Sequence, residues 1–265
     1  MTLAIRAEFR KFFTTRLWWG MAIGVFIAGA GFSLLLAIVF TLDSVKGQEG
    51  IPTGAALART VFTGGISIGY LLTLAVGVMT IGSEYRHKTI TSTFLSEPRR
   101  TVVMGAKVVS LLAIGAFYGL VSLIGSVAVG GSVLALRGQQ PFADGSIWRT
   151  LALALLVLGL WALIGLGAGI LIPNQVAALL IAIGVAWIVE PLAASLLGIF
   201  SWGKDITPYF PSQATQAMLG TGGAFGPPST DTHALVWWGA ALVLAAYAAL
   251  MAGVGSALTV RRDIS

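Results

Sequence analysis

The sequence predicts an all-α integral membrane protein with six transmembrane helices. Of its 265 residues, 57% are hydrophobic and only 10% are charged, and the mean hydropathy is +0.90. Soluble domains carry about 25% charged residues, so this composition is typical of a membrane-embedded chain. Six apolar runs also approach or exceed the ~20 residues that a helix needs to cross a bilayer. We treat residues 1–265 as one transmembrane domain.

Composition also excludes other classes of protein. The chain contains no cysteine, which excludes disulfide scaffolds and thiolate metal sites. A net charge of +6 would suggest nucleic-acid binding in a soluble protein. Here the basic residues flank apolar runs instead of forming one patch, so we expect no nucleic-acid partner.

The first segment, residues 1–16, has the pattern of an amphipathic helix lying at the membrane interface. Its apolar face is predicted to hold Ile5, Phe9, Phe12 and Phe13. The opposite face is predicted to hold Glu8, Arg10 and Lys11. A simple basic flank of the first span would explain the same periodicity equally well.

The six apolar runs place the spans at residues 17–42, 61–82, 108–136, 151–172, 176–200 and 237–260. Between the fourth and fifth spans lie only Pro173, Asn174 and Gln175, which predict a tight turn. With the N-terminus inside, the cytoplasmic segments contain eleven Lys and Arg residues and the outer segments five. This excess predicts that both termini are cytoplasmic.

Residues 83–107 form a charged stretch between the second and third spans. A stretch this polar lies outside the hydrocarbon, and its basic excess predicts the cytoplasmic side. We expect a short amphipathic helix here, ended by Pro98. On the outer side, residues 201–233 form the longest loop, in which residues 209–219 are predicted to make a short surface helix.

The sequence offers little support for enzymatic chemistry. Residues 198–205 nearly match a phosphate-binding loop, but Asp205 replaces the hydroxyl that holds magnesium and no strand precedes the motif. No metal-ligand spacing and no pair of nucleophile and base stands out. We therefore expect no catalytic activity, no metal and no cofactor in this chain.

Glu190 is the only ionisable residue deep inside a predicted span, and Pro191 follows it. A carboxylate in a membrane is costly and often functional. One interpretation is a carboxylate that faces a substrate path or gates it. The other is a structural carboxylate that is neutral or bonded to backbone near the helix break that Pro191 causes.

With this topology, the chain resembles the permease subunits of ABC-2-type bacterial ABC exporters along its whole length. The most specific likeness is the stretch after span two, which matches the family at Glu84, Thr89, Ile90, Leu95, Pro98, Arg100 and Lys107. Lys88 stands where the family has Gly. Further likenesses are residues 189–191 in span five and the exit at residues 261–263.

The resemblance implies that the stretch after span two is a coupling helix, which docks on a separate ATP-hydrolysing subunit. The docking residues would be Glu84, Tyr85, Arg86, His87, Lys88, Thr89, Phe94, Leu95, Pro98 and Arg100. It further implies that the ATPase partner binds ATP and Mg²⁺. The substrate path would lie between this chain and a second copy or a paralogous permease in a bacterial cell membrane.

Two other classes of function remain open at this point. A secondary transporter or channel would work without an ATPase, but such proteins usually carry more charged or broken spans near the midplane. A membrane scaffold or sensor protein would not need a docking helix. The substrate of an exporter would be a hydrophobic or amphipathic drug, antibiotic, peptide or lipid, because the predicted spans are mostly apolar.

Overall fold

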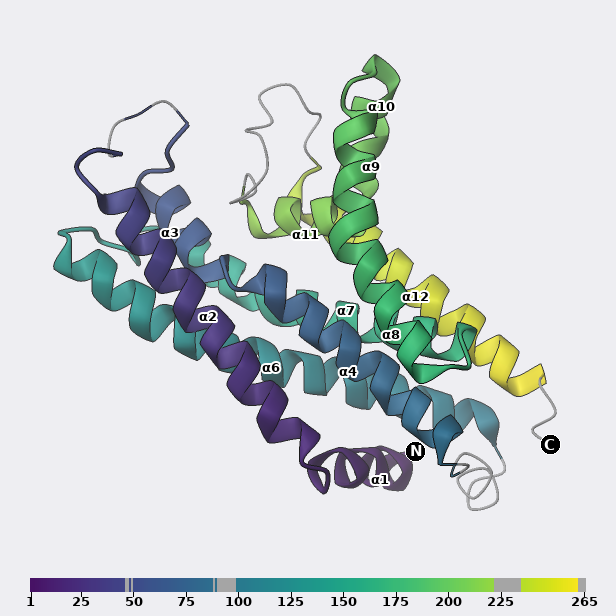
Figure 1. The fold of residues 1–265 in the computed structure, drawn as a ribbon. Helices are drawn as coiled ribbons and strands as arrows, with labels where there is room; N and C mark the ends of the chain where they lie inside the picture. The colour runs from purple at the N-terminus through teal and green to yellow at the C-terminus, as the bar shows by residue number, and fades with distance from the viewer. Residues whose placement is uncertain (46–47, 49, 88, 90–98, 222–234, 262–265) are drawn as a thin grey trace.

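The computed structural model describes residues 1–45, 48, 50–87, 89, 99–221 and 235–261 (Figure 1). Within these residues, six helices are long and apolar enough to cross a membrane, which confirms the predicted all-α membrane fold. The spans are α2 (Leu17–Thr41), α3 with α4 (Gly54–Thr63 and Ile66–Arg86), α6 (Arg100–Leu136), α7 (Ser146–Leu171), α8 with α9 (Gln175–Gly184 and Glu190–Leu197) and α12 (Trp237–Arg261).

Three helices begin several residues before the apolar runs that predicted the spans. The second span is already helical at Gly54, the third at Arg100 and the fourth at Ser146. The apolar runs that begin at residues 61, 108 and 151 therefore mark the apolar parts of these helices and not their first residues. Hydropathy indicates which residues fit the hydrocarbon, whereas a helix continues into polar sequence until a helix-breaking residue stops it.

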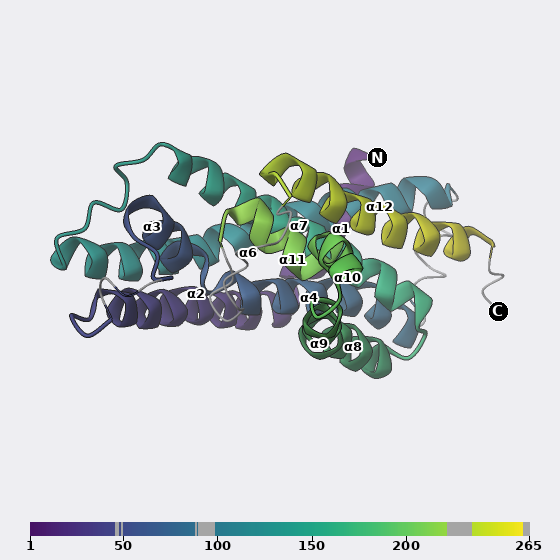
Figure 2. The same cartoon turned by 90° about the horizontal axis from the view of Figure 1, so that it is seen from above.

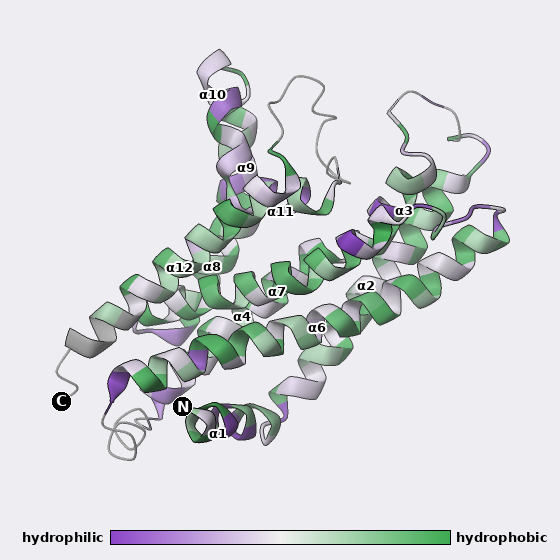
Figure 3. Ribbon diagram, turned by 180° about the vertical axis from the view of Figure 1, so that it is seen from behind, coloured by the Kyte–Doolittle hydropathy of each residue, from purple (hydrophilic) through white to green (hydrophobic). Residues whose placement is uncertain are grey.

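The centre of the bundle consists of α2, α4, α6 and α7, which run together diagonally in Figure 1. Small residues allow α4 and α7 to pack backbone against backbone. Gly77 of α4 lies against the backbone of Ala162, and Gly165 of α7 lies against the backbone of Leu74. Close approach of this kind is what small residues provide in membrane helices, where dispersion contacts hold helices together. Hydrophobic residues cover most of these spans (Figure 3).

The fifth span differs from the others in direction and in regularity. Asn174 caps α8, its side chain accepting the backbone N–H groups of Val176 and Ala177, so the predicted tight turn is present. A π-helical turn (Val185–Val189) follows α8 and leads into α9. The span rises steeply away from the bundle in Figure 1, and only a narrow strip of it is buried.

Residues 201–219, which follow the fifth span, are largely helical. It contains α10 (Ser201–Ile206), a 3₁₀ turn (Thr207–Tyr209) and α11 (Pro211–Leu219), which confirms the short helix predicted in this loop. Figures 1 and 2 show α11 lying across the bundle beside α9, α7 and α12. It ends at Gly220, whose φ of 67° is the left-handed conformation that favours glycine.

The opposite end of the bundle gathers three distant parts of the chain. Here lie the N-terminal helix α1 (Thr2–Phe13), the end of α4 and the start of α6 (Figures 1 and 3). The C-terminal end of α12 reaches the same end. The first and the last described residues therefore lie at one end of the molecule.

Candidate functional site

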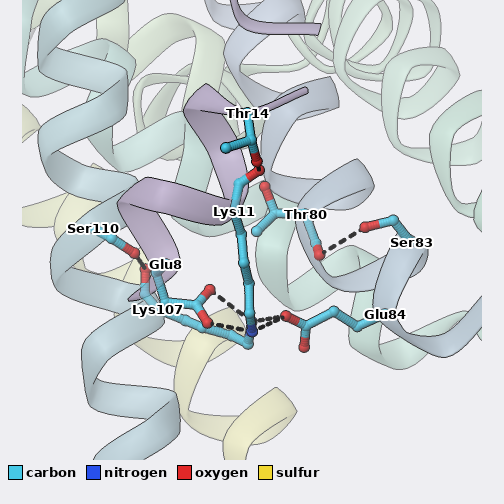
Figure 4. A network of polar contacts seen from close by, with 8 residues as sticks. All are labelled: Glu8, Lys11, Thr14, Thr80, Ser83, Glu84, Lys107 and Ser110. Atoms are coloured by element: carbon cyan, nitrogen blue, oxygen red, sulfur yellow. Dashed lines mark hydrogen bonds and ion pairs between the residues drawn. The ribbon is translucent and has the colours of Figure 1, made fainter. Parts of the chain in front are cut away.

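Four charged side chains form a buried cluster where α1, α4 and α6 meet (Figure 4). Glu8 and Lys11 come from α1, Glu84 from α4 and Lys107 from α6. Lys107 Nζ donates to Glu8 Oε2 at 2.8 Å and to Glu84 Oε1 at 2.7 Å. Lys11 Nζ donates to Glu8 Oε1 and to Glu84 Oε1, both at 2.9 Å. Each lysine thus bridges both carboxylates, and we call these four residues the charge cluster.

The two lysines differ in burial although they share both partners. The side chain of Lys107 is 1% exposed, whereas that of Lys11 is 44% exposed. Lys107 is therefore the buried lysine of the charge cluster, and Lys11 lies at its exposed edge. A buried ion pair of this kind tolerates the loss of neither partner, since the remaining charge is left without compensation.

Aromatic packing holds α1 in the position that the charge cluster requires. Phe12 packs edge-on against Tyr118 of α6, with ring centroids 6.1 Å apart, and Phe13 packs in the same way against Trp18 and Phe117. The hydroxyl of Tyr118 donates to the carbonyl of Trp18 at 3.1 Å. These contacts join α1 to α2 and α6 beside the cluster.

The structure corrects the predicted orientation of Glu8. The sequence placed this residue on the polar face, opposite Phe12, but both side chains are buried against the bundle. Residues four apart share a face of a helix, so the spacing of Glu8 and Phe12 was the signal for this arrangement. Glu8 points inward because Lys107 and Lys11 supply its counter-charges.

The electrostatics of α1 follow from this pairing. Burial alone would raise the pKa of Glu8, but the charge of Lys107 and its hydrogen bond, together with Lys11, hold that pKa below its ordinary value. Burial alone would lower the pKa of Lys11, but its bonds to Glu8 and Glu84 raise it. Both residues are therefore held in their charged forms.

One acceptor in the charge cluster is not satisfied. Both lysines bond to Oε1 of Glu84, and the buried Oε2 atom of the same carboxylate accepts no hydrogen bond from any described residue. A buried acceptor without a donor costs about 1–3 kcal/mol. Glu84 thus retains the capacity to accept one more donor.

The predicted docking residues fall into two groups. Lys88, Phe94, Leu95 and Pro98, and with them the expected coupling helix, lie outside the described residues. The others flank that segment: Glu84 is buried in the charge cluster, Tyr85 and Arg100 are half-buried, and Arg86, His87 and Thr89 are exposed. Glu84 therefore has an internal role in this structure, and its predicted contact with a partner stays a prediction.

Glu190 lies where the fifth span meets α11, with 8% of its surface exposed. Its Oε1 atom accepts the backbone N–H of Ser212 at 2.5 Å. Ser212 is the first residue of α11 with an N–H, because Pro211 precedes it. A carboxylate at a helix N-terminus bonds an otherwise unpaired donor and interacts favourably with the helix dipole. The bond to backbone beside a helix break matches the structural interpretation of Glu190, and the substrate-facing one stays a prediction.

A second polar bond holds α11, and no sequence pattern predicted it. Trp161 of α7 donates its Nε1–H to Thr215 Oγ1 at 2.9 Å, and both side chains are buried. The ring of Tyr70 on α4 stacks on Trp161, with centroids 4.3 Å apart and planes 18° apart. Aromatic residues in apolar runs predict burial but not the partner of an indole N–H.

The described residues contain no group of three or more His, Cys, Asp or Glu side chains that could hold a metal ion. The site thus consists of two parts at opposite ends of the bundle: the charge cluster, and the carboxylate that holds α11. Comparison of the chain with protein-family models, curated proteins and solved structures gave no match. The likeness to ABC-2-type permeases therefore rests on the residues and the predicted topology.

Proposed function

We propose that this chain is the transmembrane permease subunit of an ATP-driven ABC exporter in a bacterial cell membrane. It pairs with a second copy of itself or with a paralogous permease to form the substrate path. A separate ATPase subunit binds ATP and Mg²⁺ and docks on residues 84–100. The cargo is a hydrophobic or amphipathic molecule.

The observation that carries this proposal is the ion pair that joins the two ends of the segment between α4 and α6. Glu84 and Lys107 lie on the two sides of residues 88–98 and are joined by a 2.7 Å ion pair. The described ends of α4 and α6 that flank this segment are therefore held together at one point. A segment that receives force from a partner needs flanking helix ends that are held together. Otherwise the push would move the segment alone and would not move the helices.

The same contacts indicate how force would reach the spans. A push on the segment would act on α4 and α6 together, since the charge cluster holds their ends to α1. The ATPase drives transport only if it binds the two permease states with different free energies. In this scheme the chain supplies the docking surface and the substrate path, and the partner supplies the chemistry.

The orientation of the chain is tested with two matched cysteine substitutions, because the native chain has no cysteine. Leu3 and Leu136 are both strongly exposed and lie at opposite ends of the bundle. Leu136→Cys is expected to react with an impermeant thiol reagent in intact cells, and Leu3→Cys only after permeabilisation. The reverse pattern would place residues 84–100 outside the cell and refute the docking proposal.

The docking itself is tested by co-purification with a candidate ABC ATPase and by ATP turnover with and without added substrate. Phe94 is the largest apolar side chain near the middle of the segment. Phe94→Ala is expected to weaken the association by roughly 1–3 kcal/mol if Phe94 is an interface hot spot. Phe200→Ala is the matched control, since it truncates an exposed phenylalanine that follows the fifth span and lies outside the docking segment.

Each result distinguishes this proposal from its rivals. Loss of association with Phe94→Ala, and not with Phe200→Ala, supports the ABC exporter. Transport by the chain without any ATPase would indicate a secondary transporter or channel. A chain that neither binds the ATPase nor transports a substrate would be a scaffold or sensor protein.

A further inference from the structure

The N-terminal helix α1 has two faces, and the bundle uses only one of them. Glu8 and Phe12 are buried, and Figure 4 shows Glu8 pointing into the charge cluster. Arg6 and Arg10 lie two residues before and after Glu8, so each is turned away from it by about 160° around the helix. Both arginines are exposed. The sequence predicted that the face with Phe12 would meet the membrane, whereas in the structure that residue packs on the bundle and the arginines face outward.

The charges at this end of the bundle are separated by sign. The described carboxylates here belong to Glu8 and Glu84, and the charge cluster buries both. No described carboxylate forms an ion pair with Arg6 or Arg10. The exposed charged side chains described at this end are all cationic: Arg6, Arg10, Lys11, Arg16, Arg86 and Arg99. The outward face of α1 therefore presents positive charge that an anionic partner can neutralise.

Two apolar side chains border the outward arginines. Leu3 is 80% exposed and Phe13 is 40% exposed. Around the helix, Leu3 lies about 20° from Arg10, and Phe13 lies about 20° from Arg6. A face that mixes cations with apolar side chains fits phospholipid, because head-group phosphates neutralise the cations and acyl chains cover the apolar groups. An acidic protein surface would match the charges but would need a separate apolar pocket for Leu3 and Phe13.

The connection to α2 sets the depth of α1. Helix α1 ends at Phe13 and α2 begins at Leu17, and the three residues between them extend over at most about 11 Å. Trp18 and Trp19 follow at the start of the span, and tryptophan is enriched at the membrane–water interface. Figure 1 shows α1 lying across the end of the bundle. The helix therefore lies at the depth of the lipid head groups.

We propose that the outward face of α1 binds anionic phospholipid, with Arg6 and Arg10 on the phosphate and Leu3 and Phe13 against the acyl chains. Side chains four residues apart are neighbours on a helix, so both guanidinium groups reach the same head group. Arginine binds phosphate through two parallel hydrogen bonds. Zwitterionic lipids bind less well, because their head groups carry a cation of their own. This inference goes beyond the proposed transport function and does not depend on an ATPase partner.

Fluorescence quenching in reconstituted vesicles measures the lipid beside α1. Ala7→Cys provides a single labelling site, because the native chain has no cysteine and Ala7 is exposed. The labelled chain is placed in phosphatidylcholine vesicles that contain the same small fraction of brominated phosphatidylglycerol or of brominated phosphatidylcholine. The ratio of the two quenching efficiencies reports the local enrichment of anionic lipid. We expect this ratio to be well above one.

Paired substitutions identify the residues responsible. Arg6→Gln with Arg10→Gln is expected to lower the ratio about five-fold or more, since one basic residue near an anionic surface contributes about 1 kcal/mol. Arg137→Gln with Lys204→Gln removes the same charge at the opposite end of the molecule and is expected to leave the ratio unchanged. Arg6→Lys with Arg10→Lys keeps the charge and is expected to keep most of the enrichment. Thermal unfolding in phosphatidylcholine alone checks that all three variants fold.

The vesicles contain no ATPase, so the result does not depend on whether the chain is an exporter subunit. A ratio near one for the native chain overturns the proposal. Equal ratios for the native chain and the double glutamine variant also overturn it. If this variant instead loses ATPase association at an unchanged lipid ratio, the outward face of α1 binds a protein and the lipid proposal is wrong.

Discussion

The charge cluster allows a sharp test, because two lysines share the same partners and differ in burial. Lys107→Met keeps the length of the side chain and removes its charge. Glu8 and Glu84 would then be buried with only Lys11 between them, and Lys11 is the half-exposed member. Lys11→Met is the matched control, since Lys107 would still bridge both carboxylates.

The expected magnitudes follow from burial. Removal of one partner from a buried ion pair costs about 3–5 kcal/mol, because the other charge stays desolvated. Loss of the half-exposed Lys11 costs less, because its own charge is already partly solvated; pairs at the surface contribute about 0–1 kcal/mol. Lys107→Met is therefore expected to destabilise the protein several times more than Lys11→Met.

Thermal unfolding in detergent, followed by size-exclusion chromatography, measures this difference. For chains of about this size, 1 kcal/mol corresponds to about 2–4 °C in Tm. Lys107→Met is expected to lower Tm by on the order of 10 °C, and Lys11→Met by at most about 4 °C.

A second substitution separates the loss of charge pairing from the loss of packing. Glu84→Met in the Lys107→Met background removes one stranded carboxylate and leaves Glu8 paired with Lys11. We expect most of the lost stability to return, since apolar replacement of a whole buried ion pair is often neutral. Equal effects of Lys107→Met and Lys11→Met, or no recovery in the double variant, would refute the electrostatic account of the cluster.

Two further predictions concern α1 and the packing of the spans. The lowered pKa of Glu8 adds stability that is present above pH 4.5 and is lost as the pH falls through the lowered value. The raised pKa of Lys11 adds stability that is present below pH 10.5 and is lost as the pH rises through the raised value. A Tm profile that stays flat below pH 4.5 and above pH 10.5 would contradict this pairing. Gly165→Ala is expected to cost about 1–3 kcal/mol, because the new methyl group meets the backbone of Leu74. Gly184→Ala, where no atom lies within 4 Å, is expected to be neutral or stabilising by the same Tm measurement.

The spans could be predicted from the sequence because membrane insertion depends on local hydropathy. Each of the six spans is an apolar run, and no tertiary contact is needed to recognise it. The starts of α3, α6 and α7 could not be predicted in this way. Residues 54–60, 100–107 and 146–150 contain charged or hydroxyl side chains and so fell outside the apolar runs, yet nothing in them stops a helix.

The charge cluster could be predicted only in part. Glu84 and Lys107 stood out because each borders a span, but their pairing depends on the rotation of α4 and α6, which hydropathy does not fix. Glu8 was assigned to the wrong face because charge was given more weight than its spacing from Phe12. A carboxylate placed among aromatic residues on a helix face is a signal for a buried counter-charge, and here two lysines supply it.

Glu190 shows why a sequence can identify a residue without deciding its role. Its position inside an apolar run, directly before Pro191, was sufficient to select it. The choice between a structural and a functional carboxylate depends on its partner, and that partner, Ser212, lies in a separate helix, α11. The two interpretations are also not exclusive. The bond to Ser212 gives Glu190 a structural role, and a carboxylate that holds the first turn of α11 would still lie close enough to act on that helix if α11 borders a substrate path.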